Sequence, residues 1–208
     1  MVEIIENAVQ LVVLTCCAGF ACWLSLKKQN RECARLAMFY GSYVLGDLYW
    51  LLYLVCYGHT PGIFYVPYMS WYAAYVFLDL LLLCLATAEE RKFISWPSLV
   101  LPVFAAVMCV YYMQFGDYAG NLVSAVLMSL LMYHSSRGLH YLRKHPGGDG
   151  RKWMYILTLV FCFVEYAAWT ASCFFVGDTL ANPYYWFDFM VTPVVALFLP
   201  AFRKGAGI

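Results

Sequence analysis

GDLYWLLYLVCYGHTPGIFYVPYMSWYAAYVFLD, residues 46–79, holds two apolar runs joined by a connector rich in turn-forming residues. Asp47 lies near the middle of the first run and Asp79 near the middle of the second. An ionised carboxylate in hydrocarbon is costly, so an acid at membrane depth is a candidate functional residue. The aromatic rings between the two acids combine flat apolar faces with polar tips. The stretch therefore predicts two membrane-crossing helices that line a polar pocket.

The composition of the whole chain agrees with a membrane protein. Of its 208 residues, 64% are hydrophobic and 12% are charged, which is too apolar for an ordinary soluble domain. We therefore expect the lipid bilayer to be the main partner, and we expect no nucleic-acid partner. The N-terminal segment has no basic region before its apolar run, so we expect it to remain as a first membrane span.

Apolar runs of membrane-crossing length recur along the chain. A window of about 20 residues matches the hydrocarbon core of a bilayer. Long runs without alternation are helices, because only helices and closed barrels can cross a membrane. The sequence predicts an all-α fold, a polytopic membrane protein with seven transmembrane helices in a single domain, residues 1–208. The predicted spans are residues 7–26, 36–57, 67–88, 93–115, 118–136, 153–176 and 183–202.

The basic residues indicate the orientation of these spans. All 13 Lys and Arg residues fall in the segments that would lie on one side of the membrane. By the positive-inside rule, the N-terminus is outside and the C-terminus is cytoplasmic. We expect a multi-pass protein of the cell membrane, specifically the bacterial plasma membrane.

A weak internal repeat is also visible. An acid, a Trp and an aromatic connector follow one another from Asp47 in the second run and from Glu165 in the sixth. The shared order predicts two three-helix units, residues 1–88 and 118–204, linked by a helix at residues 93–115. Some transporters have parallel repeats of this kind.

The sequence gives no sign of a metal or cofactor site. Its nine cysteines lie mostly inside apolar runs and form no C-x-x-C motif, so we interpret them as small packing residues. His134, His140 and His145 are spaced six and five residues apart, which does not place them on one helix face. We interpret them as solvated loop histidines, and we expect no metal and no cofactor.

Four acids lie inside the predicted spans, with no Lys or Arg at the same depth. They must be protonated, hydrogen-bonded to hydroxyl and indole groups, or paired with an external cation. Carboxylates beside Trp and Tyr faces are suited to a small cationic or proton-coupled ligand. The expected ligand-binding residues are Asp47, Trp50, Trp71, Tyr75, Asp79, Glu165, Trp169 and Asp188.

Two structural interpretations compete with this one. The acids can be hydrogen-bonded packing elements between helices, since interhelical polar contacts in membranes contribute about 0.6 kcal/mol on average. The Tyr and Trp residues can form the aromatic belts of the membrane interfaces.

Several families share parts of this pattern. Residues 46–83 resemble uncharacterised seven-span membrane proteins of anaerobic Gram-positive bacteria. Seven spans with an external N-terminus resemble the microbial rhodopsins and the 3+1+3 sugar transporters. However, Thr192 stands where a rhodopsin needs its Schiff-base Lys, and the Pro-Gln signature of the transporters is absent. The run SYVLGDLYW, residues 42–50, resembles the Gly-Asp motif of lysoplasmalogenase-like membrane hydrolases, which have eight spans.

We expect a transporter or carrier with an acid-and-aromatic pocket open to the outside, because a compact chain without an output domain suits transport. The alternative is a seven-helix receptor or sensor that signals through a partner at residues 135–152. An intramembrane lipid hydrolase is third, since no nucleophile and base can be paired from the sequence, and no catalytic residue is assigned. A cytoplasmic protein and a second copy of the chain are further expected partners.

Overall fold

The computed structural model describes residues 1–61, 65–145 and 150–207. It is 87% helical, and no described residue lies in a strand, which confirms the all-α prediction. The helices are α1 (Val2–Lys28), α2 (Arg31–Tyr57), α3 (Tyr65–Leu85), α4 (Ala88–Lys92), α5 (Val100–Tyr112), α6 (Tyr118–Lys144), α7 (Lys152–Phe174) and α8 (Pro183–Ala206), with the short 3₁₀ helices η1 (Trp96–Leu99) and η2 (Met113–Phe115) flanking α5.

Five of these helical segments are long and apolar enough to cross a membrane, which identifies a membrane protein. They are Val2–Lys28, Val66–Leu85, Trp96–Phe115, Lys152–Phe174 and Pro183–Ala206. Helices α2 and α6 are as long as α1 but more polar. Helix α2 begins with RECAR, and α6 continues past its predicted end at residue 136 through a polar segment to Lys144.

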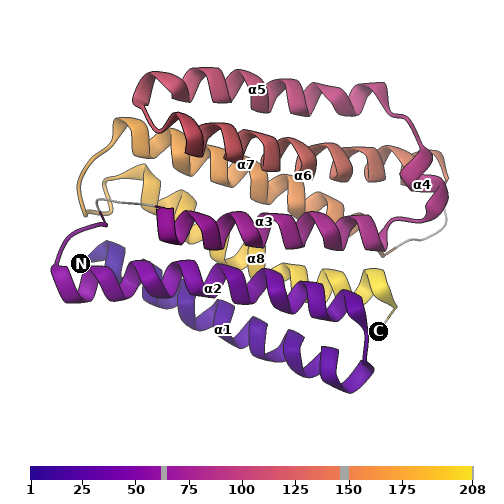
Figure 1. Ribbon diagram of the computed structural model, residues 1–208, viewed down its shortest axis with the longest axis horizontal. Helices are drawn as coiled ribbons and strands as arrows, with labels where there is room; N and C mark the ends of the chain where they lie inside the picture. The colour runs from indigo at the N-terminus through magenta and orange to yellow at the C-terminus, as the bar shows by residue number, and fades with distance from the viewer. Residues whose placement is uncertain (62–64, 146–149, 208) are drawn as a thin grey trace.

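The long helices run side by side (Figure 1), and six of them close into a ring. Each of α1, α2, α3, α6, α7 and α8 packs against the next in that order, and α8 returns to α1. Helix α5 lies outside the ring against α6. The short helix α4, which the sequence reading treated as loop, lies where α3 leads into η1 (Figure 1).

Aromatic side chains fill the centre of the ring. Phe39 of α2, Phe161 of α7 and Phe198 of α8 have no exposed surface. Their rings meet edge to face, with Phe198 5.6 Å from Phe39 and 6.1 Å from Phe161 between centroids. Tyr40 Oη donates a hydrogen bond to the carbonyl of Val195 at 2.8 Å. This core holds α2, α7 and α8 together and so fixes the helix faces that carry the acids.

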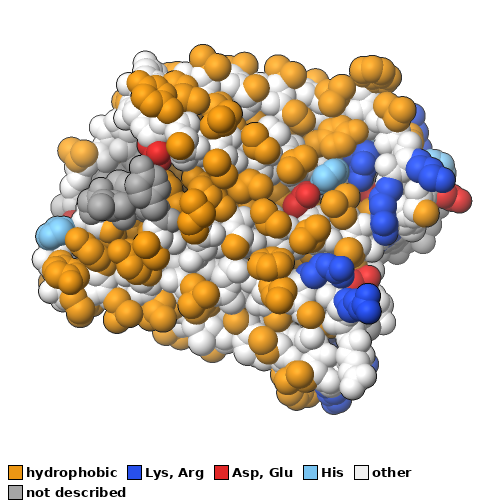
Figure 2. Space-filling view, viewed as in Figure 1, with side chains coloured by type: hydrophobic (Ala, Val, Ile, Leu, Met, Phe, Trp, Pro, Cys, Tyr) orange, Lys and Arg blue, Asp and Glu red, His pale blue; other side chains and the backbone are white. Residues whose placement is uncertain are grey.

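The two ends of the bundle differ in charge. The Lys and Arg side chains gather at one end, which we call the basic end (Figure 2). The opposite end carries the turn between α2 and α3, where Gly58 closes α2 in a left-handed conformation with φ of 74°. It also carries the start of α8, which Asn182 caps through the backbone N–H of Tyr184.

Candidate functional site

Four carboxyl groups from four different helices meet inside the ring. They belong to Glu6 of α1, Asp47 of α2, Glu165 of α7 and Asp188 of α8, and we call them the acid cluster. Glu6, Asp47 and Glu165 are buried, and Asp188 is partly buried. At a rise of 1.5 Å per residue, they lie about 6 to 15 Å from the helix ends opposite the basic end. They therefore occupy the half of the bundle without Lys or Arg.

Glu6 and Asp188 form the closest pair of the cluster. They are close enough to interact electrostatically, and Glu6 Oε1 is buried and meets no donor among the described residues. Because a carboxylate has no donor, a proton shared between the two groups would satisfy this oxygen. Asn7 Nδ2 donates to the other Glu6 oxygen, Oε2, at 2.9 Å, and Tyr184 hydrogen-bonds to Asp188 from one turn earlier on α8. The pair is therefore a candidate site for a shared proton.

Asp47 has one satisfied oxygen and one free oxygen. Its Oδ1 accepts a hydrogen bond from Trp71 Nε1 at 3.0 Å. Its Oδ2 is buried and meets no donor among the described residues. Gly46 makes room for the Trp71 contact, because a Cβ at that position would lie 2.5 Å from Trp71 Nε1. The unpaired buried oxygen costs free energy unless a proton or a cation satisfies it.

Glu165 is held by two phenols. Tyr43 Oη donates to Glu165 Oε1 at 2.8 Å, and Tyr75 also hydrogen-bonds to this carboxyl group. Helices α2, α3 and α7 are joined here. The Tyr75 ring in turn packs edge to face on Phe161 at 5.7 Å, so the phenol is fixed by the core.

A Trp pair lies beside the cluster, at a similar depth along the helices. Trp50 and Trp71 have ring centroids 5.9 Å apart. Trp50 Nε1 donates to Glu3 Oε1 at 3.0 Å, which ties α2 to the first turn of α1. The structure therefore brings together six of the residues expected at the site: Asp47, Trp50, Trp71, Tyr75, Glu165 and Asp188.

Asp79 does not join these residues. Its Oδ1 lies 2.6 Å from Nδ1 of His134 on α6, and both side chains are nearly buried. Asp79 follows Trp71 by eight residues on α3, so it lies about 12 Å farther along the axis and is turned by about 80°. That displacement carries Asp79 away from Asp47 and toward the basic end.

Trp169 packs against a different part of α7 from the cluster. Its ring packs edge to face on Tyr166 at 5.3 Å. Tyr166 in turn packs against Tyr112 and Phe104 of α5. Trp169 thus contacts the side of α7 that faces α5, although it lies only one turn beyond Glu165 on the same helix.

The interpretation of the three histidines as solvated loop residues is wrong for two of them. His134 and His140 both lie within α6, because that helix continues to Lys144. His134 pairs with Asp79, and His140 Nδ1 lies 2.9 Å from Ser95 Oγ and 3.0 Å from Ser98 Oγ. Ser95 and Ser98 are buried, so this Ser–His contact offers a substrate no access. His145 is exposed, as expected.

A second buried charge site lies at the basic end. Glu90 of α4 is 1% exposed and accepts hydrogen bonds from Arg151 Nη1 at 2.8 Å and from Tyr155 Oη. Arg151 Nη1 also donates to the carbonyl of Leu85. Gly138 permits this packing, because a Cβ there would lie 2.5 Å from the Tyr155 ring. Here the chain supplies the cation that the carboxylate needs.

Sequence reasoning missed Glu6 as a member of the cluster. A usable signal was present. Glu3, Glu6, Asn7 and Gln10 recur at helical spacing in an otherwise apolar segment. Glu6, Asn7 and Gln10 are all buried, so they form the inward face of α1.

The fold and the site define an all-helical membrane protein with an inward-facing cluster of carboxyl groups. No group of three or more His, Cys, Asp or Glu residues in the described part of the chain has the geometry of a metal site. Comparisons with protein-family models, with curated proteins and with solved structures give no match. The function is therefore argued from the geometry of the site.

Proposed function

We propose that the protein crosses the bacterial plasma membrane seven times, with its N-terminus outside and its C-terminus in the cytoplasm. Helices α2 and α6 belong to the same closed ring as four of the apolar helices, so they share the membrane with them. Their polar side chains can face the ring, where Asp47 and His134 have partners. The gathering of Lys and Arg at one end supports the orientation.

Within this topology we propose a carrier for a small cation that exchanges with protons. The observation that supports it is the acid cluster, in which four carboxyl groups meet and a proton shared between Glu6 and Asp188 would satisfy Glu6 Oε1. A cation that entered the cluster would satisfy the same oxygens and release that proton. The free Oδ2 of Asp47 supplies a further ligand atom.

The surroundings of the cluster favour a cation that arrives from outside. Glu3 lies nearer to the external helix ends than the cluster does, and its carboxylate raises the local concentration of cations. The faces of Trp50 and Trp71 can stabilise an organic cation through the ring quadrupole. Tyr43, Tyr75 and Tyr184 hold the carboxyl groups in place while the proton and the cation exchange.

Transport in proteoliposomes tests this proposal. We expect inward flux of small organic and inorganic cations to drive an outward proton flux, which a pH-sensitive dye trapped in the vesicles reports. The substitution D47N keeps the shape and the Trp71 hydrogen bond but removes the exchangeable charge, so the coupled flux should fall at least about tenfold. E89Q is the matched control, because Glu89 is exposed at the basic end.

The outcome also separates the carrier from a receptor. Cation binding without any coupled flux would overturn the carrier and support a sensor that signals through a cytoplasmic partner. Equal coupled flux in the wild-type protein and in D47N, above that of protein-free vesicles, would show that Asp47 has a structural role only. Flux in the wild-type protein no higher than in protein-free vesicles would overturn the carrier.

A further inference from the structure

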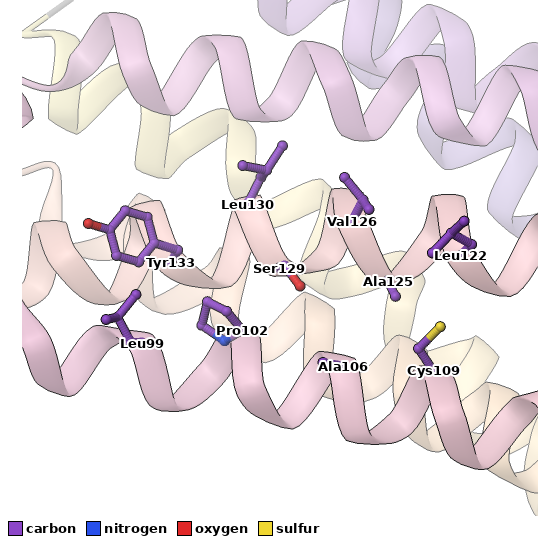
Figure 3. A pocket seen from close by; sticks show the side chains of 10 residues that line it. All are labelled: Leu99, Pro102, Ala106, Cys109, Leu122, Ala125, Val126, Ser129, Leu130 and Tyr133. Carbon is purple, nitrogen blue, oxygen red and sulfur yellow. The ribbon is translucent and has the colours of Figure 1, made fainter.

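An apolar groove runs along the outer surface between α5 and α6, with a volume of about 420 Å³. Figure 3 shows Leu99 and Tyr133 at one end and Cys109 and Leu122 at the other. Ala106 on α5 is small and exposed, and it leaves space between the two ends. The end marked by Leu99 and Tyr133 is the one nearer to the basic end of the bundle.

The length of the groove matches one leaflet of a bilayer. Leu99 and Cys109 are ten residues apart, which corresponds to about 15 Å of helix. The hydrocarbon core is about 30 Å thick, so the groove covers about half of it. A partner transmembrane helix would need the full thickness. The dimensions therefore favour a lipid acyl chain as the occupant.

A buried cation without an acidic partner lies just beyond this groove. Arg137 follows Tyr133 by one turn of α6, is 7% exposed, and has its guanidinium carbon 5.5 Å from the centroid of the Tyr133 ring. Its Nη1 donates a long hydrogen bond of 3.4 Å to the carbonyl of Arg91. Its Nε has no partner, and no carboxylate lies within 4 Å of it in the described part of the chain. An incompletely paired buried guanidinium is costly and favours a bound anion.

More positive charge surrounds Arg137 at the membrane interface. Its contact with the Arg91 carbonyl places it beside the end of α4, which carries the side chains of Arg91 and Lys92. Lys144 lies nearby, with its Nζ 5.1 Å from the centroid of the Phe93 ring. Juxtamembrane Lys and Arg residues attract anionic lipids, and guanidinium groups bind phosphate in a bidentate manner.

We propose that this surface is a binding site for an anionic phospholipid of the cytoplasmic leaflet. The phosphate binds Arg137, and one acyl chain lies in the groove between α5 and α6. The site is independent of the acid cluster, which lies inside the ring on other helices, so it does not depend on the proposed transport.

Lipid retention in native mass spectrometry tests the headgroup contact. The purified protein is mixed with equal amounts of phosphatidylglycerol and phosphatidylcholine, and the bound adducts are compared. We expect the wild-type protein to retain phosphatidylglycerol preferentially, and R137Q to reduce that preference about tenfold, as expected for a charge-assisted hydrogen bond. R143Q is the control, because Arg143 is an exposed arginine of the same helix.

A second pair of variants tests the groove without altering any charge. A106W fills the groove, whereas V110W adds the same side chain one turn farther on α5, where Val110 is 75% exposed and does not line the groove. We expect A106W to lower phosphatidylglycerol retention and V110W to leave it unchanged. The proposal is overturned if the wild-type protein retains both lipids equally, if R137Q and R143Q have equal effects, or if A106W and V110W do.

If a second copy of the chain occupied the groove instead, A106W would change the oligomeric state in the same spectra and leave lipid retention as it was. That result would also overturn the lipid site.

Discussion

The acids in the two halves of the bundle differ in the side chains that pair with them. Toward the basic end, Asp79 pairs with His134 at 2.6 Å and Glu90 pairs with Arg151 at 2.8 Å. In the other half, the acid cluster gathers four carboxyl groups, and the donors that reach them from the described residues are hydroxyl, indole and amide groups. An acid that is paired with a side chain of the same protein serves the fold. An acid whose cation must come from outside is free to bind a ligand.

This difference predicts that the largest stability losses come from the basic end. R151M leaves Glu90 buried without its cation, so thermal unfolding in detergent should show a loss of about 3 to 5 kcal/mol. The double variant E90L/R151M removes both charges and should recover most of that loss. A double variant as unstable as R151M would mean that Glu90 is not the origin of the instability.

Asp79 and Asp47, one acid from each half, should differ in their effects on stability and on cation binding. D79N removes the charge that faces His134 and should lower the free energy of unfolding by about 1 to 2 kcal/mol. D47N breaks no ion pair and keeps its Trp71 hydrogen bond, so its stability should change by less than about 0.5 kcal/mol while cation binding is lost. Unfolding curves and binding isotherms of the two variants check this. If D47N destabilised the protein more than D79N did, and D79N abolished cation binding, the proposed difference between the two halves would be wrong.

A smaller effect is expected at Gly46. G46A would place a Cβ 2.5 Å from Trp71 Nε1, so the indole must move away from Asp47 at a cost of about 1 kcal/mol. Trp fluorescence should report the displaced ring, and cation affinity should fall. Gly41 on the same helix is the control, because a Cβ there meets no atom within 4 Å. Equal responses of G46A and G41A would show that the close approach of Trp71 is unimportant.

Much of the fold could be predicted from the sequence because membrane-crossing length is a strong signal. The predicted run at residues 183–202 and the helix Pro183–Ala206 begin at the same residue, where Pro183 follows the capping Asn182. The end of α6 was missed, because polar residues on a helix that faces other helices look like a loop in a hydropathy window. The repeat of residues 1–88 and 118–204 stays a prediction.

The site was harder to predict than the fold. Depth along each span placed Asp47 and Glu165 correctly in one layer, since both lie about ten residues from a helix end opposite the basic end. Depth alone could not show that Asp79 meets His134, because that contact depends on the packing of α3 against α6. Nor could it show that Glu6 crosses to Asp188, which requires α1 to close the ring against α8.

We propose that the acid cluster holds a proton at neutral pH when no cation is bound. Infrared spectroscopy of the purified protein measures this directly through the C=O stretch of a protonated carboxyl group. We expect such a band at neutral pH, its loss in E6Q, and its persistence in D79N. A spectrum without the band, or a band that D79N removes and E6Q leaves in place, would contradict the account.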